Sequence, residues 1–148
     1  MNDPALRTHA DSPAIKFGGT AVYVNDVRAA LDFYQRAFGF TTRFFDEALQ
    51  YGELETGGSL VAFASHNTGV FLMPGQYVRP EDGRPAGVEL AFITSDVPAA
   101  FARAAVAGAV PLAEPKVMPW GATVAYLRSV EGTLIGLSTP MGGQGQLT

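Results

Sequence analysis

The sequence of 148 residues contains no cysteine, which excludes disulfide bonds, thiolate metal ligands and cysteine nucleophiles. No apolar run approaches the roughly 20 residues that span a bilayer, and no basic segment followed by an apolar one indicates a signal peptide. The Lys and Arg residues form no cluster that would attract nucleic acid. These absences predict a cytoplasmic protein with neither a nucleic-acid nor a membrane partner.

The remaining composition is that of a protein with ample material for an apolar core. Hydrophobic residues make up 47% of the chain and aromatic residues 11%, whereas charged residues make up only 16%, which argues against disorder. The formal net charge of −4 is mild. We expect one compact domain, or two small units that share a core, with flexible tails at 1–14 and 142–148.

An internal repeat organises the chain. The segment DVRAAL at 26–31 recurs as DVPAAF at 96–101, and GSLVAF at 58–63 recurs as GTLIGL at 132–137. An apolar, strand-like stretch precedes each first block, TAVYVN in one case and ELAFITS in the other. Two matched blocks in the same order predict two copies of one structural unit.

Each copy is predicted to begin with a strand followed by a helix. Asp26 and Asp96 suit the N-cap, where a side-chain oxygen accepts hydrogen bonds from free backbone N–H groups. Apolar residues then follow at helical spacing along one face. Gly39 and Gly108 stand where a left-handed residue ends a helix, and Pro98 is tolerated because it falls in the first turn.

The remainder of each copy has the composition of strands joined by turns. Gly57-Gly58 and Glu131-Gly132 mark two of these turns. The predicted strands are 41–46, 51–56 and 60–65 in the first copy and 110–112, 123–128 and 134–138 in the second. The first module thus spans 15–72, a linker rich in Pro, Gly and charge spans 73–86, and the second module spans 87–141.

Each module is therefore a βαβββ unit, and the expected fold class is α+β. One helix covers only one face of a four-stranded sheet, so the other face must be buried elsewhere or must enclose something. Pairing the two modules would form an open, eight-stranded, barrel-like cup with room for a small molecule.

The same segments carry a family resemblance. GGTAVYVNDVRAALDFYQRAFGF at 18–40 resembles the opening signature of the vicinal oxygen chelate superfamily, which includes glyoxalases, bleomycin-resistance proteins and extradiol dioxygenases. ELAFITSDVPAAFARAAVAGA at 89–109 resembles the opening of a second module. EPKVMPWGATVAYLRSVEGTLIGLSTP at 114–140 resembles the closing strands of a glyoxalase-like subgroup with a Pro-Trp-Gly motif. The resemblance covers about residues 17–140.

The resemblance also implies where a divalent metal would bind. Enzymes of that superfamily hold the ion with side chains from the first and last strand of each module, and the repeat places those positions at Gly19, Ala62, Glu89 and Gly136. Glycine and alanine have no ligating atoms, and one carboxylate cannot replace the three or four protein ligands of a Zn²⁺ or Fe²⁺ site. We therefore expect neither a metal nor another cofactor.

Glu89 and His66 are the polar candidates for the site. Glu89 begins an apolar strand, where it would pair with an arginine, face solvent, or act as a cavity carboxylate that binds a cationic or hydroxyl-bearing ligand or serves as a general base. His66 shares the strand parity of Ala62 and would lie about 13 Å beyond it. This predicts a His at the cup rim or surface, or in contact with a ligand, but too far away to join Glu89 at a metal.

Trp120 is the main aromatic candidate. Pro119 and Gly121 on either side fix the local backbone, so the ring is either part of the core or presented at the cup mouth, where a planar ligand would stack on it. Four weaker candidates for ligand contact are Phe63, Tyr51, Tyr126 and Arg128.

Two functions follow, and the residues do not decide whether the chain is an enzyme. The first is metal-independent binding of a small molecule, such as a drug or antibiotic, with Glu89 neutralising a positive group. For this branch the resemblance implies a homodimer in which both chains line each pocket. The second is a glyoxalase-like lyase or a dioxygenase-like enzyme, with a non-standard metal site or metal-free with Glu89 as base. The segment 76–87 is a candidate lid.

Overall fold

The computed structural model describes residues 14–80 and 87–140. Within these ranges the elements follow the order expected from the repeat, with one additional helix. The first module comprises β1 (Thr20–Val24), α1 (Val27–Phe38), β2 (Thr41–Asp46), β3 (Tyr51–Glu55), β4 (Val61–Ser65) and α2 (His66–Leu72). The second module comprises β5 (Glu89–Ile93), α3 (Val97–Val106), β6 (Val110–Val117), β7 (Thr123–Arg128) and β8 (Leu134–Ser138).

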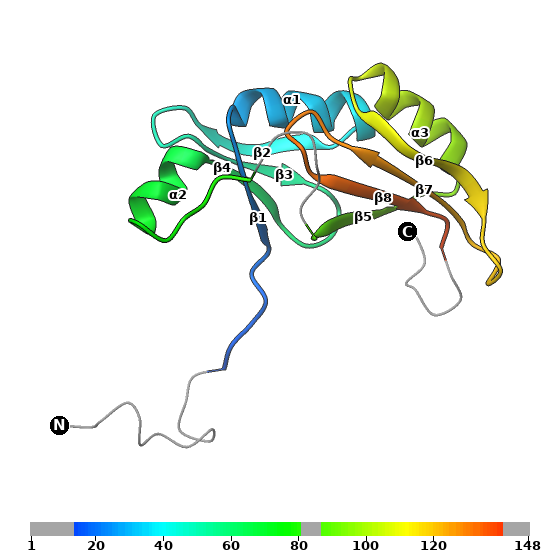
Figure 1. Ribbon diagram of the computed structural model, residues 1–148, viewed down its shortest axis with the longest axis horizontal. Coiled ribbons are helices and arrows are strands. Elements are labelled where there is room, and N and C mark those ends of the chain that lie inside the picture. The colour runs from blue at the N-terminus through cyan, green and yellow to red at the C-terminus, as the bar shows by residue number, and fades with distance from the viewer. Residues whose placement is uncertain (1–13, 81–86, 141–148) are drawn as a thin grey trace.

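The strands form two four-stranded sheets with the same internal order, β1-β4-β3-β2 and β5-β8-β7-β6 (Figure 1). In each sheet the first strand pairs in parallel with the last, and the other neighbours pair antiparallel. Within 14–80 and 87–140 no hydrogen-bonded strand pair joins the two sheets, so the cup is open rather than a closed barrel. The predicted α+β fold of two tandem modules is confirmed.

The register of the parallel pairs repeats from module to module. Thr20 lies opposite Val61 in the first sheet, and Leu90 lies opposite Ile135 in the second. Leu90 follows Thr20 by 70 residues and Ile135 follows Val61 by 74, which are the offsets of the two matched sequence blocks. The repeat read from the sequence is therefore a repeat of hydrogen-bonding register.

Helices α1 and α3 lie next to each other on the same side of the two sheets (Figure 1). Arg103 on α3 donates from Nε to the backbone oxygen of Arg36 on α1 at 2.8 Å, which ties the two helices together. We call the opposite side of the sheets the open face. Strand alternation places Tyr23, Tyr51, Glu89, Tyr126 and Arg128 on the open face, because their neighbours along each strand belong to the core.

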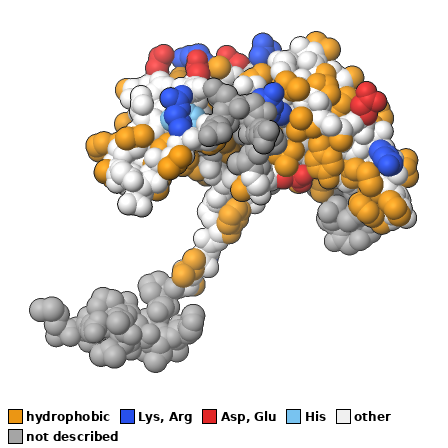
Figure 2. Space-filling view, viewed as in Figure 1, with side chains coloured by type: hydrophobic (Ala, Val, Ile, Leu, Met, Phe, Trp, Pro, Cys, Tyr) orange, Lys and Arg blue, Asp and Glu red, His pale blue; other side chains and the backbone are white. Residues whose placement is uncertain are grey.

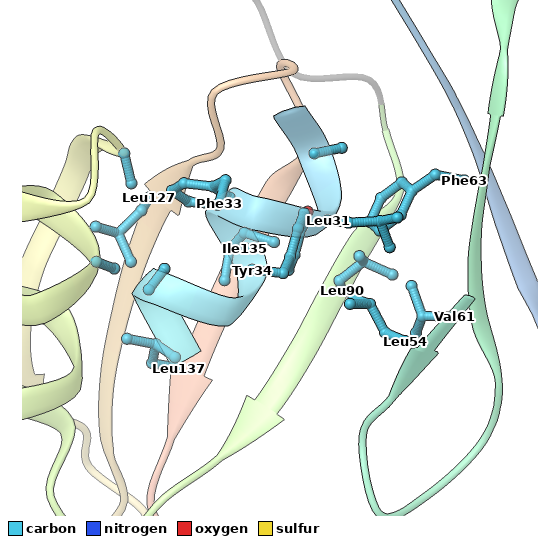
Figure 3. Close-up of a cluster of buried hydrophobic side chains, with 14 of the residues drawn as sticks. Leu31, Phe33, Tyr34, Leu54, Val61, Phe63, Leu90, Leu127, Ile135 and Leu137 are labelled. Atoms are coloured by element: carbon cyan, nitrogen blue, oxygen red, sulfur yellow. The ribbon is translucent and has the colours of Figure 1, made fainter. Parts of the chain in front are cut away.

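One apolar core serves both modules. Helix α1 belongs to the first module, yet its Phe33 and Tyr34 lie between side chains of both sheets (Figure 3). The Tyr34 ring centroid is 5.0 Å from that of Phe63 on β4 and 6.3 Å from that of Phe92 on β5. Removing either module would therefore expose core side chains of the other.

The helix caps expected from the sequence are present. Asp26 accepts a hydrogen bond from the backbone N–H of Ala29 at 3.0 Å, and Asp96 accepts from Ala99 at the same distance. Gly39 ends α1 in the left-handed region, with φ 77°. The equivalence of the two caps explains why the Asp-Val-x-Ala-Ala block recurs.

Replacing Asp26 by alanine is expected to lower the free energy of unfolding by about 1 kcal/mol, because the N–H group of Ala29 loses its acceptor. Urea unfolding measures this change. The control is Asp32→Ala, on the exposed side of the same helix, which should leave the stability within about 0.5 kcal/mol of the parent value. Equal losses in the two variants would contradict the capping role.

Two segments differ from the sequence-based prediction. The strand predicted at 60–65 does not continue through His66, because Ser65 caps a helix and its Oγ accepts from the N–H of Thr68 at 3.2 Å. The placement of His66 from strand parity was therefore wrong. The strand predicted at 110–112 extends to Val117. It lies at a sheet edge and is bulged, and these are positions where the chain tolerates proline without an N–H donor.

Parts of the prediction lie outside the described residues. These are the predicted tails, apart from residue 14, and residues 81–86 of the linker and candidate lid. The module boundaries at 15–72 and 87–141 therefore stay predictions. None of the described helices is long and apolar enough to cross a bilayer.

Candidate functional site

A pocket of about 470 Å³ opens where the two modules meet. Its walls come from residues 20–23 of β1, from Val88 and Leu90 at the start of the second module, and from residues 128 and 130–134 at the β7–β8 turn. Asn25, His66, Arg79 and Pro80 complete the lining. Each module supplies part of the wall, so neither sheet forms this pocket alone.

Two of the residues that line the pocket carry a polar atom with no partner among the described residues. Arg128 Nε and Glu131 Oε1 are both buried and make no hydrogen bond within this part of the chain. The other carboxylate oxygen of Glu131 accepts from the N–H of Thr133 at 3.2 Å and from its hydroxyl, which fixes the side chain in the turn. Among the described residues no ion pair joins Arg128 to Glu131. Buried polar groups are rarely left unpaired, so these two atoms need an explanation.

Tyr34 lies behind this turn. Its hydroxyl is buried and makes no hydrogen bond of ordinary geometry, although Ser129, Glu131 and Thr133 surround it. Burial raises the pKa of Tyr34 well above its ordinary value of 10.0, and the nearby negative charge of Glu131 raises the pKa further. The neutral phenol is therefore the state that the fold favours.

This pKa shift predicts a loss of stability at high pH. The unfolded chain releases the Tyr34 proton near pH 10, whereas the folded chain retains it, so the free energy of unfolding falls as the pH rises above about 10. The Tyr34 contribution approaches about 1.4 kcal/mol per pH unit. Urea unfolding of the parent and of Tyr34→Phe between pH 8 and 11 should show a shallower alkaline decline in the variant. An equally steep fall of the free energy of unfolding with pH in the parent and in Tyr34→Phe would contradict the raised pKa of Tyr34.

His66 and Tyr77 form a hydrogen-bonded pair at the pocket wall. His66 Nδ1 and the Tyr77 hydroxyl are 2.5 Å apart, and the Tyr77 ring packs against Tyr23 of β1 with centroids 5.3 Å apart. Burial raises the pKa of Tyr77, and Tyr23 adds to this, whereas Arg79 lowers it. Gly69 on α2 makes room for the ring, because a Cβ there would lie 2.8 Å from it.

Glu89 lies on the open face but outside the pocket lining. The side chain is exposed, and it makes no hydrogen bond or ion pair with any described residue. Its carboxylate rests over Gly136, where an added Cβ would lie 2.7 Å from the carboxyl carbon. Tyr126 stands opposite Gly136 on β7. The structure thus brings Glu89, Gly136 and Tyr126 together on the open face, with Glu89 turned to solvent.

The four positions implied for a metal do not fit a divalent cation. Gly19, Ala62 and Gly136 offer no ligating atom to join Glu89. A side chain at position 19 is also obstructed, because φ is +149° and a Cβ would lie 2.7 Å from the Leu60 carbonyl oxygen. Across 14–80 and 87–140, no three His, Cys, Asp or Glu side chains group closely enough to hold a metal ion.

The other candidates from the sequence separate into pocket, core and surface. Arg128 and His66 line the pocket. Phe63 does not face it, because this side chain is fully buried against Tyr34 on the helix side of β4. The assignment of Phe63 to a ligand site was wrong, since Ala62 and not Phe63 has the parity of the open face.

Trp120 and Tyr51 lie away from the pocket. Trp120 is 64% exposed in the turn between β6 and β7, so it neither joins the core nor lines the pocket. Tyr51 lies on the open face of the first sheet, where its hydroxyl donates to Glu53 Oε1 at 2.9 Å. Burial raises the pKa of Tyr51, followed by its hydrogen bond to Glu53.

Sequence reasoning missed most of the pocket region, including Tyr23, Tyr77, Arg79 and Glu131. Tyr23 could have been found, because it alternates with Val22 and Val24 on the first strand and must face away from the core. Glu131 precedes a turn glycine, where a carboxylate is ordinarily solvated. Arg79 and Tyr77 belong to the predicted linker, which carries no periodic signal.

Comparison with known proteins identifies a family. A family model described as the Glyoxalase/Bleomycin resistance protein/Dioxygenase superfamily matches residues 16–137. No curated protein sequence matches the chain significantly.

Solved structures show the same fold at low identity. A glyoxalase-related enzyme from Fulvimarina pelagi is 20% identical, with a TM-score of 0.73 over 90% of this chain and 96% of that one. A glyoxalase/bleomycin resistance protein/dioxygenase family enzyme from Burkholderia phytofirmans PsJN is 22% identical, with a TM-score of 0.70 over 82% and 96%. TioX from Micromonospora sp. ML1 is 25% identical, with a TM-score of 0.60 over 82% and 97%.

Proposed function

We propose, for a chain that belongs to the Glyoxalase/Bleomycin resistance protein/Dioxygenase superfamily, that its function is to bind a small molecule in the intermodule pocket without a divalent metal. The observation that carries the proposal is the pocket itself. Its volume of about 470 Å³ suits a drug-sized ligand, and its lining combines apolar side chains with polar and charged ones. Sequestering a drug or antibiotic in the cytoplasm is the use that this proposal favours.

The side chains at the four positions implied for a metal favour ligand binding over metal-dependent chemistry. Lyase and dioxygenase reactions of the glyoxalase kind use a metal to polarise oxygen atoms of the substrate. At the implied positions only Glu89 carries a ligating atom, and Gly19 could not accept a larger residue without displacing Leu60. A metal-free enzyme with Glu89 as base would need its substrate on the open face, because Glu89 lies outside the pocket lining.

We also propose that the protein forms a homodimer. Hydrophobic side chains gather over α2 and over the end of the molecule that carries β6 (Figure 2). Phe71 is 80% exposed and Leu72 60% exposed on α2, and Val117 is 67% exposed on β6. Apolar patches of this kind favour contact with another protein surface. Light scattering after gel filtration should give about twice the chain mass of 15.6 kDa.

Two measurements test the binding function. Elemental analysis of protein purified without chelator should find no stoichiometric transition metal. A thermal-shift screen of planar drugs and small acids should give ligands that raise the melting temperature, because a ligand that binds only the native state stabilises it. A stoichiometric metal bound through Glu89, or a screen without a single stabilising ligand, would contradict the proposal.

A matched pair of substitutions ties binding to the pocket. Val130→Trp would place a large ring in the pocket wall and should abolish the ligand-induced shift. Val106→Trp makes the same change on the exposed side of α3, where Val106 is 91% exposed, and should leave the shift unchanged. If the ligand still binds to Val130→Trp, the binding site lies outside this pocket.

A further inference from the structure

We propose that the ligand of the intermodule pocket is a small organic acid that also carries a hydrogen-bond donor, as a hydroxy acid or an amino acid does. Arg128 would bind the acidic group, and Glu131 would accept from the donor. This inference rests on the proposed binding function and specifies its ligand class. It differs from the ligand expected from the sequence, which was a cation neutralised by Glu89.

The charges around the pocket favour a single negative charge. Two arginines, Arg79 and Arg128, and one carboxylate, Glu131, line it, so these three side chains sum to +1. Arg79 forms no ion pair with a described residue. A monoanionic ligand would therefore bring the site to neutrality, whereas a cation would meet an excess of positive charge.

Arg128 supplies an unused donor. It projects from the end of β7, and its Nε is buried without a hydrogen-bond partner. The planar guanidinium is suited to a carboxylate or phosphate oxygen, because its N–H groups match the spacing of two such oxygens. Glu131 does not satisfy Arg128, since no ion pair within 4.0 Å joins them.

Glu131 supplies an unused acceptor in the same pocket. One oxygen is held by Thr133, so the carboxylate has a fixed orientation. The other oxygen, Oε1, is buried and forms no hydrogen bond with a described residue, although the Tyr34 hydroxyl, itself unpaired, lies near this carboxylate. A bound anion alone would repel this group. A ligand with a hydroxyl or amine N–H beside its acidic group would offer Glu131 a donor and Arg128 an acceptor, and this pairing favours hydroxy acids and amino acids over simple acids.

The body of the ligand would lie on apolar wall. Val22 of β1, Leu90 of β5 and Val130 of the turn line the same pocket. These side chains come from both modules, so an apolar substituent would contact each of them when the acidic group reaches Arg128. The expected ligand is therefore amphipathic, with its polar atoms clustered at one end.

The test uses matched ligands with the full chain. Each of three skeletons, phenyl, indole and octyl, is prepared as a 2-hydroxy acid, a simple acid, an amide and a primary amine. Isothermal titration calorimetry should rank the hydroxy acid first, then the acid, then the amide, with the amine weakest on every skeleton. The affinity of the acids should also fall as the ionic strength rises.

Substitutions assign the roles of the two charged residues. Arg128→Gln should weaken binding of the hydroxy acids on the order of 10- to 100-fold, and Arg128→Lys should recover part of this loss. Glu131→Gln should remove most of the advantage of the hydroxy acid over the simple acid. Arg36→Gln, on the exposed side of α1, is the matched control and should bind as the parent does.

Folding is followed separately from binding. Because Arg128 Nε has no partner without ligand, Arg128→Met should melt no lower than the parent in the ligand-free state while failing to bind the acids. A lower melting temperature without ligand would assign Arg128 a structural role and overturn the inference. Amides or amines that bind more tightly than acids would overturn it while leaving the binding function in place. If none of the acids, amides or amines binds, the result would count against the inferred ligand class and against the proposed binding function.

Discussion

Replacing Phe63 by alanine is expected to lower the free energy of unfolding by about 3–5 kcal/mol. The side chain is fully buried, and its ring centroid lies 5.0 Å from that of Tyr34, at the point where α1 joins the two sheets (Figure 3). Truncation would leave a cavity in the core shared by both modules, where rigid neighbours can collapse only in part. Equilibrium urea unfolding measures the loss.

The matched control is Phe17→Ala, in the segment before β1. Phe17 is 76% exposed, so the same truncation removes little buried area and should change the stability by less than about 0.5 kcal/mol. A small effect at Phe63, or equal effects at both positions, would show that Phe63 lies outside the core. Such a result would return Phe63 to the candidates for ligand contact.

The second large effect is expected at Gly52 of β3. An added Cβ would lie 2.7 Å from Leu31 Cδ1 and 3.2 Å from Val27 Cγ1, both on α1. Leu31 and Val27 are buried at 3% and 0% exposure, so neither can move aside. Gly52→Ala should therefore destabilise the protein by about 1–3 kcal/mol, because the helix must shift away from the sheet. Thermal and urea unfolding both report this change.

Gly136 of β8 is the control for Gly52, because it is also a glycine within a strand with a contact at 2.7 Å. That contact is the carboxyl carbon of Glu89, whose exposed side chain can rotate into solvent. Gly136→Ala should therefore change the stability by less than about 0.5 kcal/mol. A large loss at Gly136 would mean that Glu89 is fixed in place by a partner, which would revive its proposed role as a cavity carboxylate.

The repeat made much of the fold predictable from the sequence. Asp26 and Asp96 mark the two helix starts because capping is a local interaction that depends on residues three apart. Strand alternation likewise separates core from open-face residues wherever the register is known. The inference failed at His66, where a serine cap started a helix and the alternation ended.

The candidate site was less predictable. Arg128 and His66 were among the sequence candidates and line the pocket, whereas Glu89 and Trp120 lie outside it. Glu131 was missed, because nothing in a Glu-Gly turn shows that Tyr34 of the other module's helix will lie beside it or that one of its carboxylate oxygens will be buried.

The sequence by itself determined the two βαβββ modules, their helix caps and the alternation of core and open-face residues along their strands. It also determined that Gly19, Ala62 and Gly136 carry no metal-ligating side chain. Each depends on interactions within a few residues or on residue type alone. Only the tertiary structure decided that Arg128 and Glu131 share a pocket with β1, and that Tyr34 and Phe63 form the core between the modules. These contacts join segments dozens of residues apart, and their distances follow from packing that no local pattern encodes.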